Sequence, residues 1–157
     1  MSRSFRVFAF VPACVIALSL VAALPAAGVP VKSSTKVDPC SVITAADLAK
    51  LSTSYTITKT DLILKTNCLY TFQGAGADEG TSTSVSLFVE APSEYSMQKA
   101  IVTKAKSVKG LNGGYIGNVH GNDQAGFKTK KYAVSLSGGG NTADLILLAK
   151  AINSHLK

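Results

Sequence analysis

The chain has 157 residues, with 16 Lys and Arg against 9 Asp and Glu, a formal charge of +7 at neutral pH. The only arginines, Arg3 and Arg6, lie near the N-terminus, so beyond them the positive charge comes from lysines spread from Lys32 to Lys157. Without arginine forks to grip phosphate or read bases, we expect no nucleic-acid partner. A basic surface of this kind is instead drawn to anionic polymers or lipid head groups of a cell envelope.

The N-terminal segment has the pattern of an export signal. Two arginines precede an uncharged run of 25 residues, Val7 to Val31. Ala26 and Gly28 are small residues that suit the positions before a signal-peptidase cut. We therefore predict a signal peptide over residues 1–28 and a protein that is secreted or associated with the envelope.

Two alternatives would keep the protein on a membrane. An uncut run of 25 residues could anchor the chain, because a spanning helix needs about 20. Cys14 loosely resembles a lipidation site, but the apolar run continues beyond it and Pro12 sits awkwardly before the cut. Without an anchor or a lipid, we expect no membrane contact.

The mature chain has room for one domain. Residues 29–37 read as a flexible leader, and residues 38–157 as a single compact domain with a single core. Loss of the signal lowers the formal charge to +5, because it removes the two arginines. We expect this domain to be a monomer.

The mature chain has two cysteines, Cys40 and Cys68, and an even pair in an exported chain indicates a disulfide. A metal site is disfavoured because neither cysteine lies in a CxxC motif and His120 and His155 lack ligand spacing. Nucleophilic catalysis is disfavoured because no motif couples either sulfur to a base. We expect no metal and no cofactor.

The first elements are a short helix and two strands. Thr44 and Asp47 have capping-box spacing at the start of "ITAADLAKL", where Ile43 can pack on Leu48. Alternation then predicts a strand in "SYTITKT" and another in "NCLYTFQ". The second strand turns three side chains to the core, namely Cys68, Tyr70 and Phe72.

The remaining elements alternate between strands and helices. We predict a flexible loop over 74–84, a strand over 85–90, a helix from the N-cap Ser93 to Gly110, and a glycine-rich loop over 110–121. That helix has an apolar stripe of Met97, Ile101, Ala105 and Val108. Strands 124–129 and 132–137 should form a hairpin around Lys130, before a final helix capped by Asn141. Its apolar stripe consists of Leu145, Leu148, Ala149, Ile152 and Leu156.

Strands in runs with short connections predict an α+β fold. The sheet should be mostly antiparallel, with an N-terminal short helix, a middle helix and a C-terminal helix packed against it. A disulfide should tie the first helix to the sheet.

Several short motifs resemble one family. The stretches are "DPCSVITAADLAKL", "NCLYTF", "GGYIGNVHGNDQAGF" and "LILLAKAINSHL". Together they look like actinobacterial secreted proteins and lipoproteins of unknown function, some of which are similar to extracellular sensor domains of bacterial serine/threonine kinases. The resemblance implies an exported α+β domain with one disulfide and no known enzymatic activity. The chain departs from the family in lacking a clear lipidation cysteine and in being rich in Lys rather than Arg.

Two loops carry candidate functional residues. Tyr115, His120, Asn122 and Asp123 form a candidate interaction loop, in which Asp123 could orient His120 as a base for a hydroxyl of Tyr115 or Ser135. Turn formation explains the same residues, and we assign no catalytic residue. A candidate anion site, formed by backbone N–H groups before the last helix, comprises Gly138, Gly139, Gly140 and Asn141.

These patterns favour a non-catalytic exported domain that binds a ligand, polymer or protein in the envelope or outside the cell, in a sensor-like role at its most specific. One alternative is a small secreted hydrolase that uses His120. Another is a secreted inhibitor or modulator that acts through its loops.

Overall fold

The computed structural model describes residues 37–138 and 140–156, so the predicted signal peptide and nearly all of the leader lie outside the described residues. The described chain forms one seven-stranded antiparallel sheet in the order β1-β2-β3-β7-β6-β5-β4. The strands are β1 (Tyr55–Leu64), β2 (Asn67–Gly74), β3 (Ser82–Glu90), β4 (Thr103–Ser107), β5 (Tyr115–Val119), β6 (Asn122–Lys128) and β7 (Ala133–Gly138). The helices are α1 (Ala45–Leu48), α2 (Tyr95–Ala100) and α3 (Thr142–His155), and 3₁₀ turns cover Pro39–Ser41, Gly76–Asp78 and Pro92–Glu94. The predicted α+β class with a mostly antiparallel sheet is confirmed.

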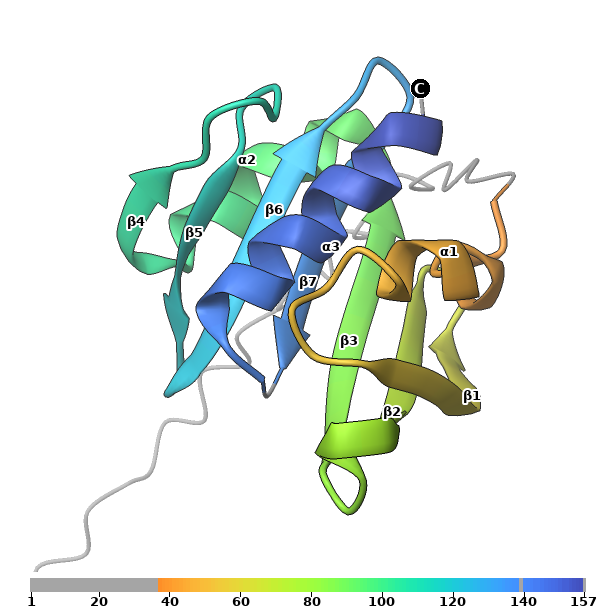
Figure 1. The fold of residues 1–157 in the computed structure, drawn as a ribbon. Coiled ribbons are helices and arrows are strands. Elements are labelled where there is room, and N and C mark those ends of the chain that lie inside the picture. Colours follow the sequence, from red (N-terminus) through yellow and green to blue (C-terminus); the bar gives the residue numbers. More distant parts are fainter. Residues whose placement is uncertain (1–36, 139, 157) are drawn as a thin grey trace, which may run out of the picture. The chain divides into compact units, whose positions relative to one another are not determined.

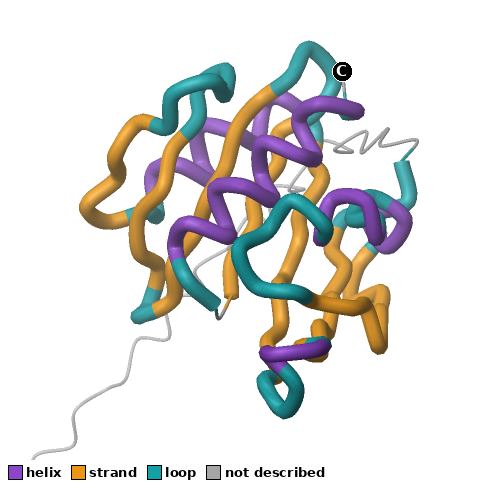
Figure 2. The backbone as a smooth tube through the Cα atoms, in the orientation of Figure 1, coloured by secondary structure: helices purple, strands orange, loops and turns teal. Residues whose placement is uncertain are grey.

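The helices cover the two faces of the sheet unequally. In Figures 1 and 2, α1 and α3 lie in front of the sheet, with α3 along β6 and β7, while α2 lies behind β5 and β6. The core lies under α1 and α3. Its strand residues are Cys68, Tyr70, Phe72, Val85, Leu87, Val89, Ile116, Ala125, Phe127, Val134 and Leu136, and its helix residues include Leu48, Leu145, Leu148, Ala149 and Ile152.

The two ends of the domain fold as their patterns predict. The capping box of α1 is complete, because the Thr44 hydroxyl accepts from the Asp47 N–H and the Asp47 carboxylate accepts from the Thr44 N–H. In α3, the Asn141 side chain accepts from the Asp144 N–H at 2.7 Å. The apolar stripe predicted for α3 is buried along its length. Local capping and tertiary burial agree at both sites.

The predicted helix over 93–110 is wrong in its second half. Ser93 lies in a 3₁₀ turn rather than at an N-cap, α2 ends at Ala100, and residues 103–107 form the edge strand β4 beside β5. The predicted stripe does not form one buried face, since Met97, Ile101 and Ala105 are exposed and only Val108 is buried. The β-branched run from Ile101 to Thr103 lowers helix propensity, and β5 offers a free edge that β4 can pair with.

The predicted glycine-rich loop over 110–121 is also wrong in part, because Tyr115–Val119 is strand β5. Val119 pairs with Asn122, which leaves His120 and Gly121 as a two-residue hairpin turn with φ of 50° and 90°. Two positive φ values match the type I′ turn of tight hairpins, which favours glycine at its second position. Gly121 therefore serves the turn.

The loop predicted over 74–84 is shorter than expected. Gly74 belongs to β2, and β3 begins at Ser82, three residues before the predicted strand. The hairpin of β6 and β7 around Lys130 is confirmed, with Lys128 opposite Ala133.

Candidate functional site

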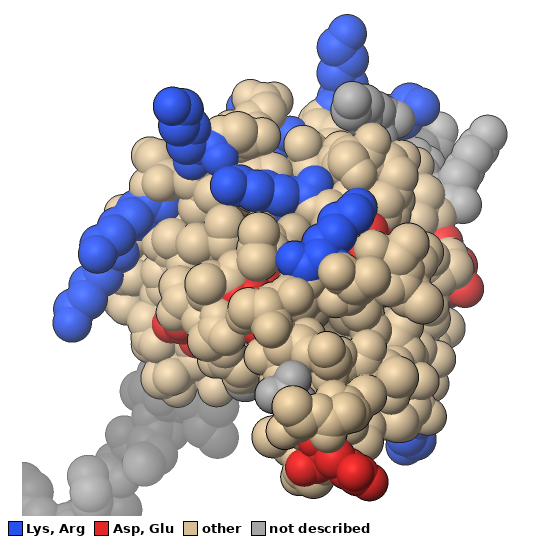
Figure 3. Space-filling model, in the orientation of Figure 1, with Lys and Arg blue, Asp and Glu red and all other residues tan. Residues whose placement is uncertain are grey.

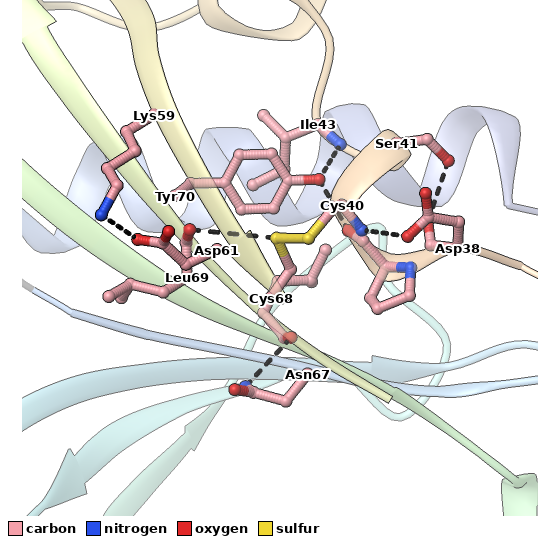
Figure 4. Close-up of a disulfide and its surroundings, with 12 residues drawn as sticks. Asp38, Cys40, Ser41, Ile43, Lys59, Asp61, Asn67, Cys68, Leu69 and Tyr70 are labelled. Atoms are coloured by element: carbon pink, nitrogen blue, oxygen red, sulfur yellow. Dashed lines mark hydrogen bonds and ion pairs between the residues drawn. A yellow bond between two sulfur atoms is a disulfide. The ribbon is translucent and has the colours of Figure 1, made fainter. Parts of the chain in front are cut away.

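The disulfide joins Cys40, in the first 3₁₀ turn, to Cys68 in β2, with their Cα atoms 5.2 Å apart, and confirms the predicted pair. Figure 4 shows that the Tyr70 ring lies beside the bridge and directs its hydroxyl to the same N-terminal segment. The hydroxyl donates to the Pro39 carbonyl at 2.6 Å and accepts from the Ile43 N–H at 3.1 Å. Burial raises the pKa of Tyr70, so this hydroxyl keeps its proton. Both cysteine sulfurs are therefore structural here.

The structure contains a histidine–carboxylate pair that the sequence patterns did not predict. His155, at the end of α3, places Nε2 3.2 Å from Oδ2 of the buried Asp47 in α1. Burial alone would raise the pKa of Asp47, but hydrogen bonds from Thr44 and the His155 interactions outweigh it and lower that pKa. The Thr44 hydroxyl also donates to Asp47 Oδ2 at 2.8 Å. These contacts tie α1 to α3, which is a structural role.

The candidate interaction loop does not bring its predicted partners together. His120 is exposed in the β5–β6 turn, whereas the Asp123 carboxylate accepts a hydrogen bond from the Thr142 hydroxyl at the start of α3. Among residues 37–138 and 140–156, no hydrogen bond or ion pair joins His120 to Asp123. The orientation of His120 by Asp123 therefore stays a prediction without a contact to support it.

The other members of that group lie apart as well. Asn122 is exposed, while Tyr115 is buried and packs against Tyr95 with ring centroids 6.0 Å apart. Ser135 is buried in β7, on the sheet face that α2 covers. Both side chains lie on the sheet face that carries α2, away from the exposed turn that carries His120.

Beside the candidate anion site, the first turn of α3 already carries a carboxylate of the chain itself. The Asp144 carboxylate lies in the first turn of α3 and accepts from the Ser52 N–H at 2.7 Å and from Asn141 Nδ2 at 2.9 Å. Burial raises its pKa, but the hydrogen bonds from Ser52, Thr53 and Asn141 prevail and lower it. An anion of the protein thus already uses the positive end of α3.

Gly138 has a packing reason to be glycine. A Cβ at this position would collide with the Ser84 carbonyl oxygen of the neighbouring strand β3. Gly140 has φ of 113°, which favours glycine on backbone grounds, and Gly139 lies outside the described residues. Close strand approach and chain reversal therefore account for two of the three glycines.

The lysines are spread along the sequence, but the fold separates charge across the sheet. Residues 95–156, here called the basic segment, contain eight lysines and two aspartates, a formal charge of +6. Residues 37–94, the acidic segment, contain three lysines and seven acidic residues, a formal charge of −4. The acidic segment supplies β1 to β3, which form one half of the sheet, and the basic segment supplies β4 to β7, which form the other half. In Figure 3 lysines gather over the upper and left part of the visible face, and an acidic group lies at the bottom.

Besides a smaller site lined in part by Lys104, Lys106 and Asp123, the basic segment forms a larger concave site at the β6–β7 turn. We call it the lysine hollow; it measures ≈ 380 Å³ and is lined by Asn112, Lys128, Thr129, Lys130, Lys131 and Asn153. The Thr129 hydroxyl accepts from the N–H groups of Lys131 and Tyr132 at 3.1 and 3.0 Å, which fixes the β6–β7 turn. Lys128 Nζ lies 5.2 Å from the centre of the Tyr95 ring.

Among the described residues, the lining of this hollow carries three ammonium groups and two side-chain amides and contains no carboxylate. Such a set of donors suits an anion with several oxygen atoms. Sequence reasoning missed the hollow because Asn112 and Asn153 are distant in the chain. The sequence feature that indicates this region is the difference in formal charge between the basic and the acidic segment.

No family model, no curated protein and no solved structure matches this chain. The resemblance to actinobacterial secreted proteins is therefore still an expectation. Within the part of the chain that the structure describes, no cluster of His, Cys, Asp and Glu is arranged to hold a metal ion. No helix in the same part is long and apolar enough to cross a membrane.

Proposed function

We propose that the mature chain is a non-catalytic exported domain that binds an anionic polymer of the cell envelope through the lysine hollow. The observation that carries this proposal is the separation of charge, with +6 on residues 95–156 and −4 on residues 37–94. A polymer with regularly spaced negative charges can contact several lysines at once and release the counterions that they held. The acidic segment repels the same polymer, which orients the domain on it.

The remaining support comes from the N-terminus and the disulfide. The export signal predicted for residues 1–28 would deliver the chain to an oxidising compartment, where a bridge such as Cys40–Cys68 persists. Lys104 and Lys106 add charge on the exposed strand β4. Lysines on an edge strand also prevent pairing with other chains, so the hollow and not β4 is the place to test.

The test uses the oxidised mature domain and two polymers with the same backbone, dextran sulfate and neutral dextran. We expect binding to dextran sulfate, weakening steeply as salt rises, and none to dextran. Replacing Lys128, Lys130 and Lys131 by Gln should weaken binding at least about tenfold and lower the salt slope by about 2.

A matched variant controls for net charge. Replacing Lys50, Lys59 and Lys65 by Gln removes the same three charges from the acidic segment. This control should bind within about twofold of the unmodified domain, because only non-specific long-range attraction is lost. Equal losses in the two variants would show that total charge, and not the hollow, determines binding.

A further inference from the structure

The helix α2 leaves a second concave site, which we call the α2 groove, on the sheet face opposite α3. It measures ≈ 300 Å³ and is lined by Phe88, Glu90, Met97, Gln98, Ile101 and Gln124, with Ser135 beneath. This volume lies at the lower end of the range of small-molecule sites. Three strands, β3, β6 and β7, supply its base.

The walls of the groove are apolar and open to solvent. Met97, on α2, and Ile101, directly after it, have exposed fractions of 62% and 57%. Single exposed apolar side chains are common on protein surfaces, but a pair beside a groove forms a patch that a ligand can cover. Phe88 is half-buried beside them. An apolar body that enters the groove would cover all three side chains and gain the free energy of their burial.

The base of the groove is polar and deeply buried. Gln98 and Gln124 are only 7% and 6% exposed. The Gln98 amide donates from Nε2 to Glu90 Oε2 at 2.7 Å, and the Gln124 amide donates from Nε2 to the Tyr115 hydroxyl at 3.1 Å. Both amide NH₂ groups therefore bond within the protein, and the carbonyl oxygens are left as acceptors.

Gln98 Oε1 is the one buried side-chain polar atom in the described residues without a hydrogen-bond partner. Reversing the amide would place this oxygen against the Glu90 carboxylate, so the orientation with Nε2 toward Glu90 is the favoured one. Buried acceptors are nearly always satisfied in native proteins. The Gln98 carbonyl oxygen can therefore accept a hydrogen bond from a donor that enters the groove.

Glu90 adds a negative charge at the same place. It is half-buried, and no ion pair involves it among the residues that the structure describes. A carboxylate at the edge of an apolar groove favours a cationic donor over a neutral one, because the low local dielectric strengthens the attraction. A carboxylate ligand would be repelled, even though the domain as a whole is basic.

We propose that the α2 groove binds a small apolar ligand that carries an ammonium group. The apolar part packs against Phe88, Met97 and Ile101, and the ammonium group donates to the Glu90 carboxylate and the Gln98 carbonyl. This site is distinct from the lysine hollow, and the inference does not rest on the proposed polymer binding. Either proposal can fail while the other holds.

The test is an NMR titration of the ¹⁵N-labelled, oxidised mature domain with three probes of equal chain length: n-octylammonium chloride, n-octanol and sodium octanoate. We expect n-octylammonium to bind at least about tenfold more tightly than n-octanol, and octanoate to bind weakest. The side-chain NH₂ resonances of Gln98 and Gln124 should shift. Equal binding of the first two probes, tighter binding of octanoate, or no shift at either glutamine would overturn the proposal.

Variants separate the contribution of charge from that of apolar contact. Glu90→Gln retains an acceptor for Gln98 and should abolish the preference for n-octylammonium over n-octanol. Glu79→Gln removes the same charge from an exposed position outside the groove and should keep that preference. Met97→Ala, at an exposed site that does not threaten folding, should weaken both probes by similar factors.

A second copy of the chain could cover the groove instead. Sedimentation would then show a dimer, and the Gln98 and Gln124 resonances would shift on dilution without any probe. That result would overturn the proposal of a small ligand.

Discussion

The Tyr70 hydroxyl joins the N-terminal segment to the sheet, so Tyr70→Phe should destabilise the domain clearly. The hydroxyl is fully buried and makes two hydrogen bonds, to the Pro39 carbonyl and from the Ile43 N–H. Each bond contributes about 1 kcal/mol net, and a buried group left without a partner costs about 1–3 kcal/mol. We therefore expect the free energy of unfolding to fall by about 2–4 kcal/mol.

The assay is guanidinium unfolding of the oxidised mature domain, followed by circular dichroism. The matched control is Tyr55→Phe, because the Tyr55 ring packs on Phe72 at 6.0 Å but its hydroxyl makes no hydrogen bond within the described residues. We expect the control to lose less than about 0.5 kcal/mol. If Tyr70→Phe lowers the free energy of unfolding no more than the control does, the two hydrogen bonds of this hydroxyl do not stabilise the domain as we expect.

Three further predictions concern the bridge, the buried carboxylate and the exposed histidine. Replacing Cys40 and Cys68 by Ala should lower the free energy of unfolding by about 3.5 kcal/mol, because the bridge joins residues 28 positions apart in the sequence. In the unmodified mature domain, alkylation without reductant should find no free thiol. The folded-state pKa of Asp144 is lowered, so its stabilising contribution is complete above its unfolded pKa near 3.8 and is lost as pH falls through the folded value. Asp144→Asn should therefore lower the free energy of unfolding at pH 7 and make it decline less as the pH falls. An unchanged decline in acid would contradict this role of Asp144. His120→Ala should leave binding to dextran sulfate unchanged, whereas a large loss would place the exposed turn in the binding site.

The sequence predicted those parts of the fold in which local pattern and burial agree. The capping box at Thr44 and Asp47, and the Asn141 cap, are set by residues three positions apart, so no tertiary information is needed to find them. The pairing of Cys40 with Cys68 followed from count and compartment.

Elements that depend on distant partners were missed. Met97, Ile101, Ala105 and Val108 have a helix-compatible spacing of apolar side chains, but residues 103–107 pair with the free edge of β5 as a strand. The glycines around Tyr115 resembled a loop, although Gly117 and Gly126 allow close packing inside the sheet. In both cases tertiary pairing outweighs local propensity.

The candidate sites show the same division. His120 and Asp123 are close in sequence, but His120 is exposed in the turn while Asp123 accepts a hydrogen bond from Thr142. Packing at Gly138 and the capping of α3 explain the glycine-rich segment before this helix. The lysine hollow and the α2 groove combine residues from distant parts of the chain, as in the case of Asn112 with Asn153. Only the overall charge and the chain's lysine content pointed toward the hollow in advance.

The most direct test of the central claim is NMR mapping of the oxidised mature domain with sucrose octasulfate, a small probe with many anionic oxygens. We predict that backbone shifts concentrate at residues 128–131, together with the side-chain amides of Asn112 and Asn153. Weak shifts spread evenly over all lysines, including Lys50, Lys59 and Lys65, would contradict the claim that the lysine hollow is the binding site.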